Sequence, residues 1–201
     1  MSSLIHKVEN IMSEDVGKIF SINDFYNLGT KNTIKSILYR LNEEGHIARL
    51  IDGLYVKPKY SKILKEYSYP DAADVAEKIA EKFSWTIAPI GDIALNYTGV
   101  STQVSNEYIY VSDGEYREYL YRGRKIIFRH TSNRNITSYS RGFAILIQAI
   151  RALGKGNIRE EHIKRFALFS KTIKEDLRKD AAKLPFWIQE VLSRIQEVKN
   201  G

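Results

Sequence analysis

The sequence predicts an α+β protein with a small helical N-terminal domain and a larger C-terminal domain that mixes strands and helices. Three observations support this fold class. The length of 201 residues fits one or two domains of ordinary size. Segments with helical periodicity alternate with short apolar runs and turn residues. Basic residues also gather in two separate segments, which suggests two distinct surfaces.

The first part of the chain is predicted to form two helices around a short strand. Apolar side chains at helical spacing predict the first helix over 4–12. The run 16–20 is short and partly β-branched, which favours a strand. Ser21 is a suitable N-cap for a second helix because Asp24 follows three residues later, and we expect that helix to end at Gly29.

A third helix and a hairpin are predicted next. Thr30 can cap a helix whose apolar residues repeat at intervals of three and four until Gly45, which can adopt a left-handed conformation at the helix end. The Asp52-Gly53 pair is a strong turn signal between the apolar runs 47–50 and 54–57. The complete order of helix, strand, helix, helix and hairpin is that of a winged helix-turn-helix.

We therefore divide the chain into three parts. Residues 1–60 are predicted to be a winged helix-turn-helix DNA-binding domain. Residues 61–70 are predicted to be a linker, because they include Lys62, Lys65 and Pro70 and no long apolar run. Residues 71–201 are predicted to be an α+β domain that ends in helices.

The second domain is predicted to contain a small sheet between helices. Asp71 suits the start of its first helix, and a short strand at 86–88 and a short helix at 92–97 follow. Three β-rich segments come next: 108–112, 118–121 and 125–130. Because glycine turns separate them, we expect a small antiparallel meander. Apolar stripes at helical spacing predict that the remainder forms C-terminal helices.

Composition excludes several classes of protein. The absence of cysteine excludes disulfide scaffolds, thiol nucleophiles and cysteine-based metal sites. No apolar run approaches the roughly 18 residues that a membrane span needs, so we expect no membrane segment and a cytoplasmic location. The four histidines are scattered and no phosphate-binding glycine motif occurs, so we expect no metal site, no cofactor and no catalytic residue.

Positive charge is concentrated in two segments. The formal net charge is +7, which favours a polyanionic partner. Residues 30–66 contain eight basic and four acidic side chains, and residues 115–159 contain ten basic and two acidic ones. The intervening residues 67–114 carry a net charge of −5, from two basic and seven acidic side chains.

The third predicted helix carries the residue types that read DNA. The side chains opposite and beside its apolar stripe include Asn32, Lys35, Ser36, Tyr39 and Arg40. Lysine and arginine donate to phosphates or guanine, asparagine pairs with adenine, and serine or tyrosine reaches the DNA backbone. Any solvated helix can carry such residues, so the DNA interpretation depends on the element order and on Arg49 in the following hairpin.

The second basic segment mixes arginines with aromatic residues. Its cations include Arg117, Arg122, Arg124, Lys125, Arg129, Arg134, Arg141 and Arg151. Three interpretations stay open: stacking and phosphate binding with RNA, a solvated sheet face, or docking to an acidic protein. For the protein-docking interpretation, the candidate partner-binding residues are Arg117, Arg122, Arg124 and Arg129.

Short segments in both halves share one family resemblance. Those in the first half are Gly17–Phe20, Leu38–Leu41, Glu44–Leu50 and Gly53–Tyr55. Those in the second half are Ala88–Gly91, Ala94–Asn96, Gly99–Val104, Tyr108–Gly114 and Ile126–Arg129. Over about residues 4–155, the chain resembles AbiEi-like antitoxins, the bacterial transcriptional regulators of type IV toxin–antitoxin pairs that act in abortive infection.

The resemblance implies a function for each half. The first half would bind inverted repeats in its own promoter as double-stranded DNA and repress transcription, with two copies of a monomer or weak dimer on each operator. The second half would oppose a nucleotidyltransferase-like toxin. The DNA-reading positions implied are Lys31, Asn32, Lys35, Ser36, Tyr39, Arg40 and Arg49. The alternative is a stand-alone RNA-binding protein that uses residues 115–141, whereas a nuclease would need a carboxylate cluster that we cannot assemble from the sequence.

Overall fold

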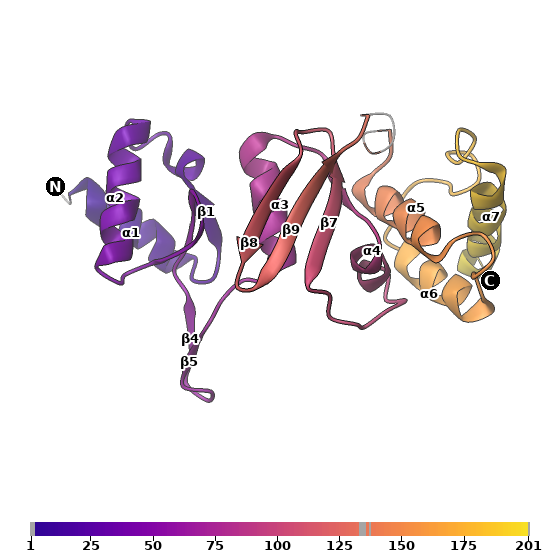
Figure 1. Cartoon of the computed structure of the whole chain (residues 1–201), viewed down its shortest axis with the longest axis horizontal. Helices are drawn as coiled ribbons and strands as arrows, with labels where there is room; N and C mark the ends of the chain where they lie inside the picture. Colours follow the sequence, from indigo (N-terminus) through magenta and orange to yellow (C-terminus); the bar gives the residue numbers. More distant parts are fainter. Residues whose placement is uncertain (1–2, 133–135, 137, 201) are drawn as a thin grey trace. The chain divides into compact units, whose positions relative to one another are not determined.

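The computed structural model describes residues 3–132, 136 and 138–200, which form a mixed α+β fold with seven α-helices and three small sheets (Figure 1). The α+β class predicted from the sequence is therefore confirmed. The chain forms two compact units. The first extends to Ser84 and includes Tyr119–Arg124, and the second comprises Trp85–Glu118 and the residues from Lys125 onward.

The first unit begins with helices packed on a three-stranded antiparallel sheet. Its elements in order are α1 (Leu4–Glu14), β1 (Ile19–Ser21), the 3-10 helix η1 (Ile22–Phe25), α2 (Lys31–Glu43), β2 (Ala48–Ile51) and β3 (Leu54–Val56). The strands have the order β1-β3-β2, so β3 lies in the centre. Buried side chains from α1, η1 and α2, among them Met12, Phe25 and Leu38, form one core.

The N-cap of α2, the glycine that follows α2 and the glycine in the hairpin turn have the roles that the sequence predicts. The side chain of Thr30 accepts a hydrogen bond from the backbone N–H of Thr33 at 3.3 Å, which confirms the N-cap. Gly45 follows the helix with a φ of 75°, a left-handed conformation that glycine adopts without strain. Gly53 has a φ of 74° in the turn between β2 and β3. The predicted third helix and hairpin are confirmed.

The second predicted helix, over 22–29, is wrong in length. Only the single 3-10 turn η1 forms, and turns replace the rest. The cap itself is present, because the backbone N–H and the hydroxyl of Ser21 both donate to the Asp24 carboxylate, at 2.6 and 2.8 Å. Phe25 is buried and Ile22 and Leu28 pack partly against the same core, at intervals of three residues that suit a 3-10 turn.

A two-stranded hairpin and a helix complete the continuous part of the first unit, up to Ser84. Strands β4 (Lys59–Ser61) and β5 (Glu66–Ser68) pair with each other and include part of the predicted linker. Helix α3 (Ala72–Phe83) begins at Asp71, whose carboxylate accepts hydrogen bonds from the N–H groups of Ala73 and Asp74. The helix start predicted there is confirmed. The division into domains at residues 60 and 71 stays a prediction about independent folding.

The four-stranded sheet differs from the predicted antiparallel meander, which is wrong. Its strands are β6 (Ile87–Pro89), β7 (Glu107–Ser112), β8 (Arg117–Tyr121) and β9 (Arg124–His130), in the order β6-β7-β9-β8. Strand β9 runs parallel to β7 and lies between β7 and β8. Only the Arg122-Gly123 turn joins neighbouring strands, and both of its residues have positive φ angles.

Burial explains why β7 and β9 are neighbours. Tyr110 of β7 and Phe128 of β9 are fully buried and stack with their ring centroids 5.8 Å apart. Strand β8 alternates between partly buried and exposed residues, as expected for an edge strand. The Asp113-Gly114 turn does not reverse the chain onto β7. Asp113 instead accepts a hydrogen bond from the backbone of Thr86, and a side chain at Gly114 would overlap the Trp85 ring.

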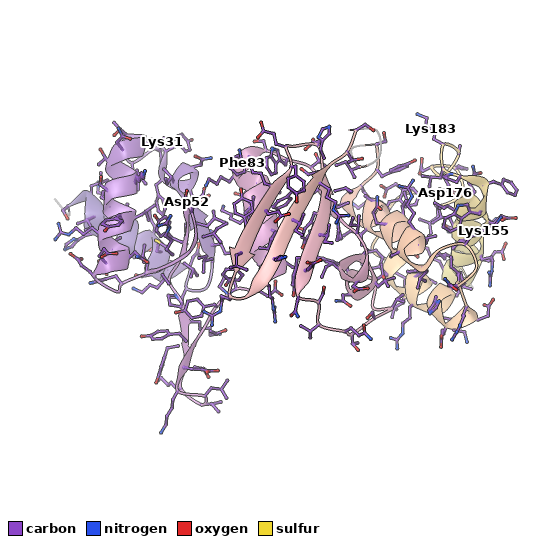
Figure 2. All side chains as sticks on the ribbon, viewed as in Figure 1. Lys31, Asp52, Phe83, Lys155, Asp176 and Lys183 are labelled. Carbon is purple, nitrogen blue, oxygen red and sulfur yellow. The ribbon has the colours of Figure 1, made fainter. Side chains whose placement is uncertain are left out.

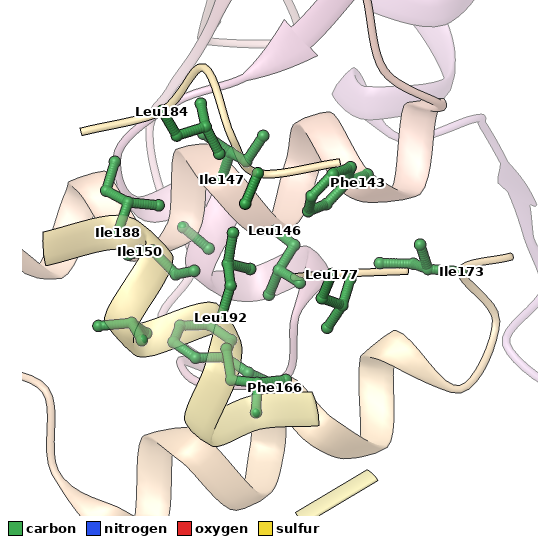
Figure 3. Close-up of a cluster of buried hydrophobic side chains, with 14 of the residues drawn as sticks. Phe143, Leu146, Ile147, Ile150, Phe166, Ile173, Leu177, Leu184, Ile188 and Leu192 are labelled. Atoms are coloured by element: carbon green, nitrogen blue, oxygen red, sulfur yellow. The ribbon is translucent and has the colours of Figure 1, made fainter. Parts of the chain in front are cut away.

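Helices dominate the second unit. They are α4 (Asp92–Tyr97), α5 (Arg141–Leu153), α6 (Glu160–Ser170) and α7 (Phe186–Asn200). Figure 3 shows side chains of the last three helices, including Leu146, Phe166 and Leu192, pointing into one shared cluster. Eight consecutive residues of α5, from Phe143 to Ile150, are buried, so α5 is the central helix of this core. The predicted C-terminal helices over 143–153 and 187–198 are confirmed.

Candidate nucleic-acid interface

Helix α2 presents two parallel rows of polar side chains to solvent. Residues four apart lie on one side of a helix, so the candidates divide into two adjacent rows. The first row is Lys31, Lys35 and Tyr39, and the second is Asn32, Ser36 and Arg40. All six are exposed, whereas Ile34, Leu38 and Leu41 on the opposite side are buried. Figure 2 shows Lys31 at one end of α2, pointing to solvent.

Most of these side chains are available for a ligand. Within the part of the chain that the structure describes, the side chains of Lys31, Asn32, Lys35 and Tyr39 have no hydrogen-bond or ionic partner. The hydroxyl of Ser36 donates to the backbone carbonyl of Asn32 at 3.0 Å, so it is already used within the helix. The candidate face therefore offers two ammonium groups, a carboxamide and a phenol.

Arg40 is paired in this structure. Its Nε donates to Glu44 Oε1 at 2.8 Å, and both side chains are exposed. The hydrogen bond and charge of Glu44 raise the pKa of Arg40, and Arg40 in turn lowers the pKa of Glu44. Exposed pairs of this kind contribute little to stability, so a phosphate can replace Glu44 as the partner of Arg40 at small cost.

Strand β2 is attached to α2 by a side chain that the sequence does not point to. Asn42 near the end of α2 accepts a hydrogen bond from the backbone N–H of Arg49 at 2.8 Å. The side chain of Arg49 pairs with Asp52 in the same hairpin. Asn42 has no feature in the sequence that distinguishes it from a solvated helix residue, because its partner lies on another element.

A partly buried ion pair supports the short turn that precedes α2. Lys78 of α3 donates to Asp24 of η1 at 3.0 Å and to Glu81 at 2.7 Å. Burial by itself would raise the pKa of Asp24, but the hydrogen bonds from Ser21 and Lys78 outweigh it and lower that pKa below its ordinary value of 3.8. The sequence predicts Asp24 as a capping residue, but not its ion pair with a residue 54 positions away.

Two arginines of the second basic segment lie against aromatic rings. The guanidinium of Arg122 lies 4.3 Å from the ring centroid of Tyr69, and that of Arg117 lies 5.6 Å from the ring centroid of Trp85. Arg117 is also 3.4 Å from a carboxylate oxygen of Glu115. These contacts give both side chains a role within the fold.

The other two candidate arginines point in opposite directions. Arg124 and Arg129 belong to the same strand, β9, and are an odd number of residues apart. Successive side chains in a strand alternate between the two faces of a sheet, so these two cannot share a face. Arg134, which the sequence places in the same basic segment, lies outside the described residues. The structure does not gather Arg117, Arg122, Arg124 and Arg129 on one sheet face.

Two further features, a metal-binding cluster and a membrane-spanning helix, are absent from the part of the chain that the structure describes. Residues 3–132, 136 and 138–200 contain no group of three His, Asp or Glu side chains that could hold a metal ion. Over the same residues, every helix is too short or too polar to cross a membrane.

Comparison with known proteins identifies the family. No curated protein matched the chain. A family model, by contrast, matches residues 6–178. These residues include most of both compact units, but not α7, and every candidate nucleic-acid-binding residue. Because the match covers most of its length, the protein belongs to the family described as "Family of unknown function (DUF6088)".

Proposed function

We propose that the protein is a sequence-specific DNA-binding transcriptional repressor that acts on its own promoter. The observation that carries this proposal is the arrangement of the first unit. The element order α1-β1-η1-α2-β2-β3 and the strand order β1-β3-β2 support the interpretation of this unit as a winged helix, with η1 as a shortened second helix. In that arrangement α2 is the recognition helix and the β2–β3 hairpin is the wing.

The exposed face of α2 has suitable dimensions and chemistry for the major groove. Its 13 residues make a helix about 20 Å long, and the major groove is wide enough for one helix. Lys31 and Lys35 can neutralise phosphates, whereas Asn32 can donate to and accept from one adenine edge. This division predicts that the lysines supply affinity and Asn32 supplies sequence preference.

Replacing Asn32 by Ala is expected to weaken binding to the promoter by about 1–3 kcal/mol and to leave binding to unrelated DNA nearly unchanged. The side chain of Asn32 is exposed and has no partner in the described structure, so the change should not affect folding. The measurement is a footprinting titration of the full chain on duplex DNA from immediately upstream of its own gene. Asn10→Ala, at an exposed position of α1, is the matched control.

Two outcomes would contradict the assignment of Asn32 as a base-reading residue. One is an equal loss of affinity on promoter and unrelated duplexes. The other is wild-type binding that is equally tight on promoter DNA, unrelated DNA and single-stranded RNA, which would favour the RNA-binding alternative. A footprint confined to the promoter repeats would instead support two copies of the protein on one operator.

The repressor also serves, in this proposal, as the antitoxin of a type IV pair that opposes a nucleotidyltransferase-like toxin. The support is the sequence resemblance to AbiEi-like antitoxins, which covers both halves of the chain. The test is co-expression with the product of the neighbouring gene in bacteria. Restored growth supports the antitoxin role, whereas a neighbour that is harmless by itself, or toxicity that this protein does not relieve, removes it.

A further inference from the structure

The β4–β5 hairpin, residues 59–68, is an arm that belongs to no larger sheet. Its two strands pair only with each other, through Lys59 with Ser68, Tyr60 with Tyr67 and Ser61 with Glu66. Figure 1 shows the arm as a narrow ribbon extending from the body of the first unit. Tyr60 and Tyr67 contact each other with ring centroids 5.1 Å apart, and both remain at least half exposed.

The tip of the arm exposes two adjacent aliphatic side chains. Ile63 is 93% exposed and Leu64 is 68% exposed. Neither belongs to a core cluster of the described structure, so neither stabilises the fold by burial. A two-stranded hairpin is only marginally stable by itself in water. Large aliphatic residues at its tip therefore need an explanation outside the folded chain, and a binding contact provides one.

The charges around this tip specify the kind of partner. Lys59, Lys62 and Lys65 are exposed, and Glu66 is the single acidic residue of the arm. The tip has a defined shape, because the N–H of Leu64 donates to the Ser61 hydroxyl at 3.2 Å and Lys65 has a φ of 54°. The grooves of DNA combine phosphates at their edges with apolar surfaces between the stacked bases. A narrow arm with lysines on both sides of an aliphatic pair is therefore complementary to DNA.

We propose that the arm enters the minor groove of the DNA that α2 binds, so that Ile63 and Leu64 wedge into one base-pair step while Lys62 and Lys65 contact the adjacent phosphates. This inference rests on the proposed DNA-binding function and adds a second contact to it. Aliphatic side chains that insert between base pairs partly unstack them from the minor-groove side. The six residues from Pro58 to Ile63 span five steps of extended chain, or about 17 Å, which exceeds the depth of the groove.

The test compares two double variants of the full chain on the promoter duplex. Ile63→Ser with Leu64→Ser removes the aliphatic wedge, and Lys62→Gln with Lys65→Gln removes the charges. Leu168→Ser, at an exposed aliphatic residue of α6, is the matched control. The readouts are footprinting, salt-dependent affinity, and fluorescence of 2-aminopurine placed at successive steps beside the α2 footprint, which increases when a base unstacks.

Wild-type protein is expected to raise the fluorescence at one step beside the α2 footprint. The serine variant should lose this signal and bind about 10-fold more weakly, with the α2 footprint unchanged. The glutamine variant should reduce the slope of log affinity against log salt by about 0.9 for each lysine removed. Thermal melting should be unchanged in both variants because the substituted side chains are exposed.

Three results would overturn the inference. If the serine variant keeps wild-type affinity and fluorescence, the wedge does not exist, although the recognition role of α2 stands as long as Asn32→Ala still discriminates between sequences. If the serine variant instead changes the sedimentation mass of the free protein, the tip is a contact between copies. If the wild-type chain does not bind the promoter duplex at all, the proposed function fails and the arm contact fails with it.

Discussion

Changing Lys31 and Lys35 together to Glu is expected to weaken promoter binding by about 3 kcal/mol, or roughly 100-fold, without lowering the melting temperature. Both side chains are exposed in one row of α2 and neither has a partner in the described structure. Each substitution removes a phosphate contact and places a carboxylate opposite a phosphate, so loss and repulsion add. Equilibrium titration at fixed salt, with a thermal melt of the same sample, measures both quantities.

The control must separate a local contact from the effect of net charge. Lys155→Glu with Lys183→Glu makes the same change in net charge at two exposed positions of the second unit (Figure 2). If α2 supplies the direct phosphate contacts, this control should lower affinity far less than the α2 pair, since charges more than about 10 Å from the DNA are screened at moderate salt. Equal losses in the two double variants would show that α2 is not the DNA-contacting face.

The parts of the first unit that the sequence predicts correctly depend on neighbours along the chain. The start of α2 at Thr30, its apolar stripe and the glycine that follows it act within one or two helical turns. The same kind of signal is misleading at 22–29, where a correct cap begins only a single 3-10 turn whose apolar side chains repeat every three residues. A cap indicates where a helix can begin, but packing determines how far it continues.

Strand order could not be predicted by the same means. Segments β7, β8 and β9 follow each other with turns between them, and this pattern favours a meander when read locally. The observed parallel pairing of β7 with β9 is favoured because it places the fully buried rings of Tyr110 and Phe128 in register on one face of the sheet. That preference involves contacts with segments far away in the sequence.

For the same reason, the sequence predicts only part of the candidate site. Helical periodicity correctly predicts that Lys31, Asn32, Lys35, Ser36, Tyr39 and Arg40 are exposed. The ion pair of Arg40 with Glu44 lies at a spacing of four residues and could have been predicted. The four arginines of the second basic segment are close in sequence, but strand alternation and aromatic contacts separate them. Whether any of these residues binds DNA or a protein stays a prediction.

Replacing Asp24 by Ala is expected to lower the free energy of unfolding by about 3 kcal/mol at neutral pH. Asp24 is 28% exposed and accepts hydrogen bonds from Ser21 and from Lys78, whose own side chain is only 10% exposed. The substitution leaves Lys78 with Glu81 alone and removes the cap of η1. Urea unfolding measures the change, and Asp15→Ala, which breaks only the exposed pair with Lys18, should cost less than about 0.5 kcal/mol.

The pH dependence of this difference identifies the ionised carboxylate as its source. The folded pKa of Asp24 lies below 3.8, so the unfolded chain takes up the proton first as the pH falls. The stabilisation is therefore complete above the unfolded pKa and is lost as the pH falls through the folded pKa. The gap between wild type and Asp24→Asn should be the same at about pH 7 and about pH 5 and should shrink at about pH 3. A gap that does not change down to about pH 3 would show that packing at this position, and not the charge of Asp24, stabilises the turn before α2.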